Sequence, residues 1–304
     1  MRRLTALLTA LIMTGSALSA QERGFIGFGH LLTNDIIGDR DDRWRTGSYQ
    51  ASMLWGPEWT GALPERFGAL IELRFAGEIV APEDISRAVP GDRPYGGVLT
   101  LGLHTHFAYG GLENSVGLDI AVTGPQTRLD DLQSFLHNTF DGPKMSSAVR
   151  DRQISNGVYP TLVIETGRRI TLSPSLHVRP FLEGRAGLET LARVGADLTF
   201  GQVGRDALMI REPVAGQRYR SVADGFQGVA FVLGGDVAYV YDSALLPGNR
   251  SVTPEDYRIR LRSGVHWQPR TGISGFYGLT WLGKEFTTQS DSQVVGSIRL
   301  DLEF

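Results

Sequence analysis

Several short stretches of this sequence carry side chains suited to acid–base chemistry and to ligand binding. They are Asn34-Asp35, Asp42-Arg43, Thr46, the charged segment 82–93 and His137. An imidazole titrates near neutral pH, so His137 is the natural proton acceptor of this set. The motif Gly-x-Ser-x-Gly, which presents the serine of many hydrolases, does not occur in the chain. A serine hydrolase of that type is therefore not expected, whereas a water deprotonated by His137 could be the nucleophile.

The elements that must position these residues are strands with one apolar and one polar face. In the last strand, Ile298, Leu300 and Leu302 alternate with polar residues up to the terminal Phe304. Such alternation predicts one face in an apolar medium and the other in water. The sequence contains about twelve segments of this kind, separated by turn signals, at 22–31, 46–56, 66–80, 94–110, 112–123, 156–170, 174–189, 190–202, 226–243, 253–268, 271–285 and 291–304.

An export signal at the N-terminus points to a bacterial outer membrane. Residues 1–20 combine basic Arg2 and Arg3, an apolar stretch and small residues through Ala20, as secretory signals do. No segment reaches the roughly 20 apolar residues of a membrane-spanning helix. A membrane protein with this sequence must then close its backbone hydrogen bonds as a barrel. We predict an all-β fold in which 21–304 form one transmembrane antiparallel barrel of about 12 strands; the alternative is a secreted soluble β-protein.

Composition sets further limits on function. The chain has no cysteine, which excludes disulfides and thiolate chemistry. Its formal net charge of −3 gives no sign of nucleic-acid binding. Oligomeric state cannot be read from the sequence, and a monomer is the expectation. The 38 glycines and modest hydropathy suit a barrel, because half of each strand is polar.

The order of the strands predicts that the polar stretches meet at one rim. With both termini periplasmic, the odd-numbered connections lie outside the cell. Asn34-Asp35 then ends the first strand at the outer rim, Asp42-Arg43 and Thr46 lead into the second, and 82–93 forms the second external connection. The segment 203–225 is an exception, because its position makes it periplasmic, where short turns are expected. Either it is an unusual insert or the strand count is wrong there.

One segment has the periodicity of a helix. Segment 126–139 carries apolar side chains at helical spacing, namely Leu129, Leu132 and Leu136. We expect a helix on the outer surface, with this apolar stripe packed on the barrel wall. Gln133 and His137 are four residues apart, so they share one side of the helix.

Taken together, these stretches resemble a known family, the outer-membrane lipid A 3′-O-deacylases. The resemblance covers most of the mature chain and keeps the order and spacing of its elements, which are Asn34-Asp35, Asp42-Arg43-Trp44-Arg45-Thr46-Gly47, Asp92-Arg93-Pro94-Tyr95-Gly96-Gly97, Gly124-Pro125 and Gln133-Ser134-Phe135-Leu136-His137. It implies a twelve-stranded barrel with an active site between the wall and an external helix. It also implies calcium-dependent hydrolysis of an acyl ester of lipid A, so lipopolysaccharide is the implied partner.

The family's functional residues map onto positions of this chain one by one. His137 matches the catalytic histidine, Asn34 and Asp35 match a pair of polar residues, and Thr46 matches a hydroxyl at the start of the second strand. A calcium ion needs hard oxygen ligands, which Asp35, with Asn34 or Thr46, would offer. The family also uses a lysine in the second external connection. Here that loop has no lysine, and Arg87 is its nearest cation.

Two other functions stay open at this point. A phospholipase-like barrel would pair its histidine with a nucleophilic serine, for which Ser48 or Ser134 would have to serve. A non-catalytic barrel or pore is favoured by the missing lysine. The remaining inward-facing polar residues are interpreted as lumen side chains, the arginines paired with acidic neighbours: His104, His106, Arg258, Arg260 and Arg262. Which acyl chain is cut and which metal is used cannot be read from the residues.

Overall fold

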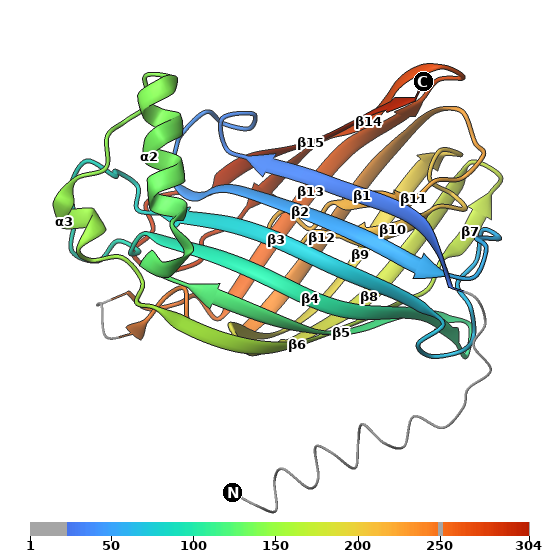
Figure 1. The fold of residues 1–304 in the computed structure, drawn as a ribbon, viewed down its shortest axis with the longest axis horizontal. Coiled ribbons are helices and arrows are strands. Elements are labelled where there is room, and N and C mark those ends of the chain that lie inside the picture. The colour runs from blue at the N-terminus through green and yellow to red at the C-terminus, as the bar shows by residue number, and fades with distance from the viewer. Residues whose placement is uncertain (1–22, 249–251, 304) are drawn as a thin grey trace, which may run out of the picture.

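The computed structural model describes residues 23–248 and 252–303 and shows a closed antiparallel barrel of twelve wall strands (Figure 1). Neighbours in sequence pair with each other, and the pairings β6–β8 and β1–β15 complete the ring. The predicted fold is confirmed; the predicted signal and Phe304 lie outside the described residues. The wall strands are β1 Gly24–Asn34, β2 Trp44–Gly56, β3 Leu70–Ala81, β4 Gly96–Tyr109, β5 Leu112–Thr123, β6 Gly157–Gly167, β8 Leu176–Ala186, β9 Glu189–Gly201, β12 Gly228–Ser243, β13 Tyr257–Gln268, β14 Gly272–Leu282 and β15 Gln293–Glu303.

The wall is apolar outside and polar inside, as the alternation predicts. On β4, Leu101 and Leu103 are exposed on the outer surface, whereas His104 is buried in the lumen and bonds to Asp119 of β5 at 2.6 Å. A short strand, β7 (Ile170–Ser173), pairs with β8 beside the wall. Among the described residues, no helix is long and apolar enough to cross a membrane.

The lumen is filled by ion pairs, both between neighbouring strands and across an intervening strand. Arg262 of β13 pairs with Asp197 of β9 at 2.6 Å, and Arg260 pairs with Asp236 of β12 at 2.9 Å. Arg258 of β13 pairs with the carboxylate of Glu189 of β9 at 2.7 Å. The predicted pairing of these three arginines is therefore confirmed, as is the inward position of His104 and His106.

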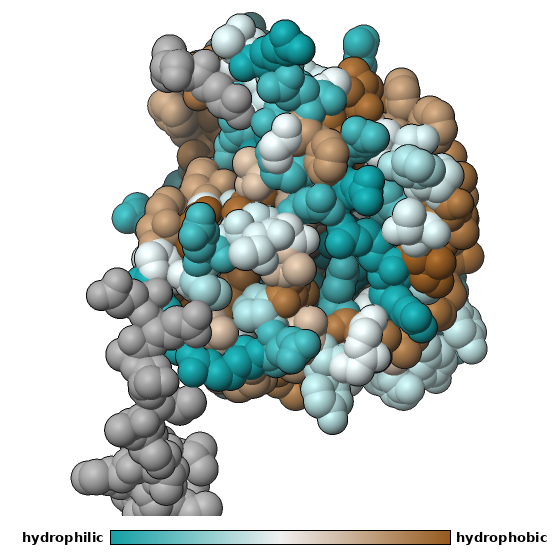
Figure 2. Space-filling view, turned by 90° about the vertical axis from the view of Figure 1, so that its right-hand side faces the viewer, coloured by the Kyte–Doolittle hydropathy of each residue, from teal (hydrophilic) through white to brown (hydrophobic). Residues whose placement is uncertain are grey.

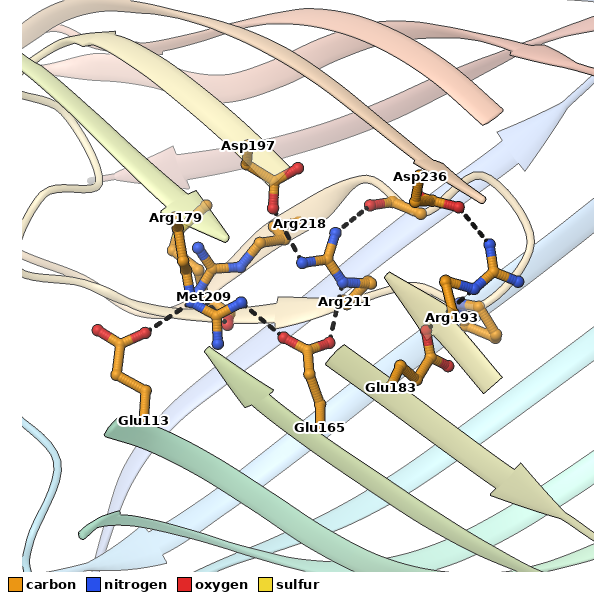
Figure 3. Close-up of polar contacts among 12 residues, drawn as sticks. Glu113, Glu165, Arg179, Glu183, Arg193, Asp197, Met209, Arg211, Arg218 and Asp236 are labelled. Carbon is orange, nitrogen blue, oxygen red and sulfur yellow. Dashed lines mark hydrogen bonds and ion pairs between the residues drawn. The ribbon is translucent and has the colours of Figure 1, made fainter. Parts of the chain in front are cut away.

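The connection between β9 and β12 folds back into the lumen as a hairpin. Its two strands are β10 (Leu208–Arg211) and β11 (Arg218–Val222). Tyr219 of this hairpin is fully buried and bonds to Gln50 of β2 at 2.7 Å. Arg211 lies between Glu165 and Asp197, at 2.9 Å from each (Figure 3). The segment 203–225 is thus an insert, and the strand count stands.

Glycines in β1 allow this hairpin to approach the wall closely. A Cβ atom at Gly27 would overlap the carbonyl oxygen of Ser221, and one at Gly29 would overlap the Ser221 side chain. The hairpin also forms an apolar cluster with the wall, in which Leu208 and Ile210 pack with inward-facing leucines of β1, β2 and β3. Figure 2 views the end where β1 begins; hydrophilic residues fill the middle of this end, and apolar residues line its right flank.

The opposite end of the barrel carries the helices (Figure 1). We call it the helical end, and the end where β1 begins and β15 ends the terminal end. The connection between β5 and β6 contains η1 (Pro125–Thr127), α2 (Leu129–Thr139) and α3 (Ser147–Arg150). The predicted helix is therefore present. The expectation that its leucines pack on the wall is wrong for Leu132 and Leu136, which are exposed.

Candidate active site

The loop between β1 and β2 brings three of the predicted site residues together. Asn34 lies opposite Gly47 in the strand pairing, so the end of β1 lies beside the start of β2. The Asn34 side-chain amide donates to the carbonyl oxygen of Thr46 at 2.8 Å, and the Asp35 amide donates to the same oxygen at 3.2 Å. A bulge between Arg45 and Gly47 removes Thr46 from the pairing with β3. Its backbone is therefore free to bind the loop.

Two carboxyl groups of this loop interact, one of them buried and the other half-buried. Asp35 is 0 % exposed, and its Oδ2 accepts a hydrogen bond from the Arg43 amide at 3.0 Å. Burial, followed by the negative charge of Asp42, raises the pKa of the Asp35 carboxyl to about 8. Burial also raises the pKa of Asp42, while the nearby His137 opposes that rise. The two groups repel each other as anions, which a proton or a cation would relieve.

Two buried oxygen atoms of this loop, Asp35 Oδ1 and Thr46 Oγ1, make no hydrogen bond within the described chain, and a third, Asp42 Oδ2, faces Nε2 of His137 at 3.1 Å. Buried polar atoms are normally paired, so unpaired ones that gather in one place mark a site for a ligand. In residues 23–248 and 252–303, no three His, Cys, Asp or Glu side chains are arranged as a metal cluster. A cation here would combine two carboxylates with neutral oxygens, a donor set that fits a hard ion such as calcium.

Helix α2 places a histidine over the two carboxylates. Its buried face carries Asp130, which pairs with Arg150 at 2.5 Å and ties the helix to α3. One turn further along the same face, the Gln133 amide donates to Asp42 Oδ1 at 3.5 Å. His137 follows, with Nε2 at 3.1 Å from Asp42 Oδ2. Gln133 and His137 therefore share one side of the helix, as predicted.

The hydrogen bond on the far side of the His137 ring fixes its tautomer. Nδ1 lies 2.6 Å from the carbonyl oxygen of Pro143, which can only accept, so Nδ1 carries a proton. In the neutral imidazole, the Nε2 lone pair then faces Asp42. A lone pair and a carboxylate oxygen at 3.1 Å repel each other unless a proton or a cation lies between them. His137 and Asp42 thus form a pair able to take up and release a proton.

A cavity of about 180 Å³ opens beside this pair. It is lined by side chains of α2 and of the segment that follows it, together with one residue of the loop between β3 and β4: Ile85, Gln133, Ser134, His137, Asn138, Pro143, Lys144 and Met145. Lys144 is one of only two lysines in the chain and is exposed. The cavity therefore presents an imidazole and an exposed cation to whatever enters it.

The structure does not bring Arg87 to the other predicted site residues. Its side chain is 74 % exposed and pairs with Asp84 at 2.9 Å within its own loop. Arg93 is buried and pairs with Glu285 at 2.6 Å. The interpretation of Asp92-Arg93-Pro94 as a structural ion pair before a strand therefore agrees with the coordinates.

The last wall strand holds the site loop in place. β1 and β15 pair only from Leu32 to Asn34. Beyond Asn34 the loop continues the contact, because the Asp39 amide donates to the Val294 carbonyl at 3.0 Å and the Val294 amide donates to the Asp39 carboxylate at 2.8 Å. The Gln293 side chain accepts from the amide of Arg45 at 3.0 Å and donates to the carbonyl of Arg43. The seam between the first and last strands thus shapes the site.

Three residues with a place in this site were not selected from the sequence. Asp42 was recognised only as part of a motif, Gln133 only as a neighbour of His137, and Lys144 not at all. Their roles depend on how the loop between β1 and β2 meets α2, which no periodicity encodes. The rarity of lysine in an arginine-rich chain was the one available signal for Lys144.

Comparisons with known proteins can now be set beside this geometry. A family model described as outer membrane protein LpxR matches residues 4–304. The solved structure of LpxR from Salmonella typhimurium superposes with a TM-score of 0.73 at 18 % identity, covering 91 % of this chain and 100 % of that one. The β domain of the Bordetella autotransporter BrkA is more distant, with a TM-score of 0.41 at 11 % identity, covering 92 % of this chain and 99 % of that one. No curated protein sequence matches.

The family model spans nearly the whole chain, and that coverage decides the assignment. The chain belongs to the LpxR family. It is an outer-membrane β-barrel, which confirms the resemblance drawn from its motifs. Identity with Salmonella LpxR is low enough that the superposition speaks for the fold alone. The roles of residues in this LpxR-family barrel therefore rest on the contacts of its own side chains.

Proposed function

We propose that this protein is an outer-membrane esterase that removes the 3′-O-linked acyloxyacyl chain from lipid A. The family supports a lipid A deacylase. The observation that carries the proposal is the pairing of His137 with Asp42, above the unpaired oxygens of Asp35 and Thr46, at one rim of a membrane barrel. A proton acceptor, a cation-binding oxygen set and an adjoining cavity are the parts that ester hydrolysis requires.

His137 acts as the general base in this mechanism. The Pro143 carbonyl holds Nδ1 protonated, which leaves the lone pair of Nε2 to accept a proton from water. Asp42 lies at 3.1 Å from Nε2 and stabilises the imidazolium that forms. The same proton then passes from His137 to the leaving alkoxide of the sugar, so the pair ends the cycle as it began. Gln133 keeps Asp42 in position from the neighbouring turn of α2.

Asp35, Asp42 and Thr46 are the residues that would hold calcium. Together they supply two carboxylates and one hydroxyl, of which Asp35 Oδ1 and Thr46 Oγ1 make no hydrogen bond within the described chain. When bound, the ion polarises the ester carbonyl and lowers the energy of the oxyanion. Asn34, which the family resemblance also offers as a ligand, has another role in this proposal, because its amide nitrogen binds Thr46 and its oxygen accepts from the Ile36 amide at 2.8 Å. Asn34 therefore shapes the loop.

Lys144 is the cation that we assign to the cavity. It lies on the same cavity wall as His137 and is free to approach an oxyanion or a phosphate of the substrate. Arg87 remains the sequence-based candidate for this role. Of the two, only Lys144 lines the cavity among the described residues.

The two alternative functions fit the contacts less well. Ser48 donates to Glu212 inside the lumen at 2.9 Å, and Ser134 donates to the Asp130 carbonyl at 2.7 Å. Neither serine is bonded to His137, so a phospholipase-like nucleophile is disfavoured. A pore is disfavoured because the hairpin of β10 and β11 occupies the lumen.

Expression in a host that makes hexa-acylated lipid A tests the proposal. Mass spectrometry of the lipid A is expected to show loss of one acyloxyacyl group. His137→Ala should abolish this loss while the barrel still folds, as judged by its heat-modified gel mobility. Ser134→Ala is the matched control on the same helix and should keep the activity.

A chelator should stop the purified enzyme and calcium should restore it. Full activity of His137→Ala, or indifference to the chelator, would contradict the mechanism.

A further inference from the structure

Helix α2 presents polar side chains to the protein and apolar side chains to its surroundings. Asp130 and Gln133 are buried, at 6 % and 3 % exposed. Leu132, Phe135 and Leu136 are 47 %, 64 % and 41 % exposed. A helix on the surface of a water-soluble protein has the opposite arrangement. The inversion indicates that the medium outside α2 is apolar along part of its circumference.

The polar face of α2 is turned inward because its side chains bond to other residues of the rim. Asp130 pairs with Arg150, and Gln133 and His137 face Asp42. The apolar residues of the helix are then forced to the outside. Single exposed apolar residues are common on proteins, but a contiguous set opposite buried polar residues is not. This face therefore requires an apolar partner.

The outward half of α2 is itself divided. At 100° per residue, Leu132, Phe135 and Leu136 fall on one side of it, whereas Asp131 and Asn138 fall on the other. Both Asp131 and Asn138 are exposed. The helix thus has a site face, an apolar face and a polar face that contacts water. That division is expected for a helix lying at the boundary between hydrocarbon and water.

The apolar face of α2 is continuous with the apolar outer wall. α2 packs on β4, where Leu129 lies against Gly97. Near the same end of the barrel, Leu101, Ile120 and Val158 are exposed on the outer surfaces of β4, β5 and β6. The axis of α2 runs across the barrel axis at this rim (Figure 1), which places the helix parallel to the plane of the membrane. The wall is already an established lipid interface, and α2 extends it.

We propose that the face formed by Leu132, Phe135 and Leu136 lies in the outer leaflet and contacts the acyl chains of its lipids. The helix is then an interfacial element, with Asp131 and Asn138 directed to water. If the proposed esterase function also holds, this face borders the route by which an acyl chain leaves the bilayer and reaches His137. The lipid contact itself does not depend on that function.

Site-directed spin labelling tests this contact, and the natural absence of cysteine makes the labelling specific. Single variants Leu132→Cys and Phe135→Cys are labelled with a nitroxide and reconstituted into vesicles that contain lipopolysaccharide. Asn138→Cys on the polar face is the matched control. All three positions are exposed, so the barrel should fold, and heat-modified mobility confirms it. Relaxation of each label is measured with oxygen, which concentrates in hydrocarbon, and with a water-soluble nickel chelate.

The labels at 132 and 135 are expected to show a severalfold higher ratio of oxygen to nickel accessibility than the label at 138. Equal ratios at the three positions, or a higher ratio at 138, would overturn the proposal. The measurement requires no catalysis. An inactive enzyme with lipid-exposed labels would therefore reject the proposed esterase alone, whereas an active enzyme with water-exposed labels would reject the lipid contact alone.

Discussion

At the level of single residues, the proposed mechanism depends on the positions of one histidine and two carboxyl groups. The His137 ring has one nitrogen fixed by the Pro143 carbonyl and the other directed at Asp42. The Asp35 and Asp42 carboxyls cannot both be anionic at little cost in the same buried loop. In the proposed mechanism, proton transfer by His137 and cation binding by Asp35 would therefore be coupled through Asp42, which interacts with both side chains.

Substitution of Lys144 separates the two candidate cations. Lys144→Gln should lower the rate of lipid A deacylation by about 10²-fold, a loss typical of removing one group that stabilises an oxyanion. Arg87→Gln is the matched control and should change the rate little, because the Arg87 side chain is exposed and bound to Asp84. The rates are measured with purified protein in vesicles. A greater loss in Arg87→Gln would return the role to the arginine.

Calcium binding should strengthen as the pH rises towards 8. Burial raises the pKa of the Asp35 carboxyl to about 8 in the folded protein, so the calcium-free folded state retains a proton that the unfolded state loses. That proton stabilises the fold at low pH, and its contribution is lost as the pH rises through 8. Because calcium must displace the proton, its affinity should rise by up to about tenfold per pH unit below 8 and then level off. Calorimetric titrations measure this slope, and Asp35→Asn should flatten it.

At the level of elements, the sequence predicts the strands well and the loops poorly. Period-two alternation survives in every wall strand because one face meets lipid and the other meets the polar lumen. The spacing of its leucines predicts helix α2 correctly, but it does not reveal that Leu132 and Leu136 are exposed and do not pack on the wall. In the sequence, the only sign of the hairpin of β10 and β11 is that segment 203–225 is too long for a periplasmic turn. Its place in the lumen depends on partners such as Glu165 and Asp197, which lie far away in the sequence.

The hairpin should close the barrel to ions. The intact protein is expected to show no conductance in planar bilayers, because side chains of β10 and β11 fill the lumen from β1 to β3. A variant in which a short Gly-Ser linker replaces residues 206–223 should conduct. Arg218→Gln, which removes a charge but leaves the bulk of the hairpin, is the control and should stay closed. Steady conductance by the intact protein would show that the lumen is not sealed.

At the level of the whole molecule, polar and apolar groups are arranged in reverse of a soluble protein. Apolar side chains cover the outside, while buried ion pairs hold the interior. Examples are Arg262 with Asp197 and Arg211 with Glu165, of which the second is drawn in Figure 3. Removing one member of a buried pair leaves an uncompensated charge, which typically costs about 3–5 kcal/mol. The closed ring satisfies the backbone hydrogen bonds that lipid could not. The barrel is thus a rigid scaffold for the loops and helices that form the candidate site at its helical end.

The seam between β1 and β15 links biogenesis to activity. Before the last strand arrives, the segment after Asn34 lacks the main-chain contacts of Val294 and the side-chain bracket of Gln293. The carboxylates of Asp35 and Asp42 then have no fixed geometry under His137. In the proposed mechanism, a polypeptide that is still open along this edge would therefore be inactive. Lipid A hydrolysis would begin only once β1 and β15 have paired.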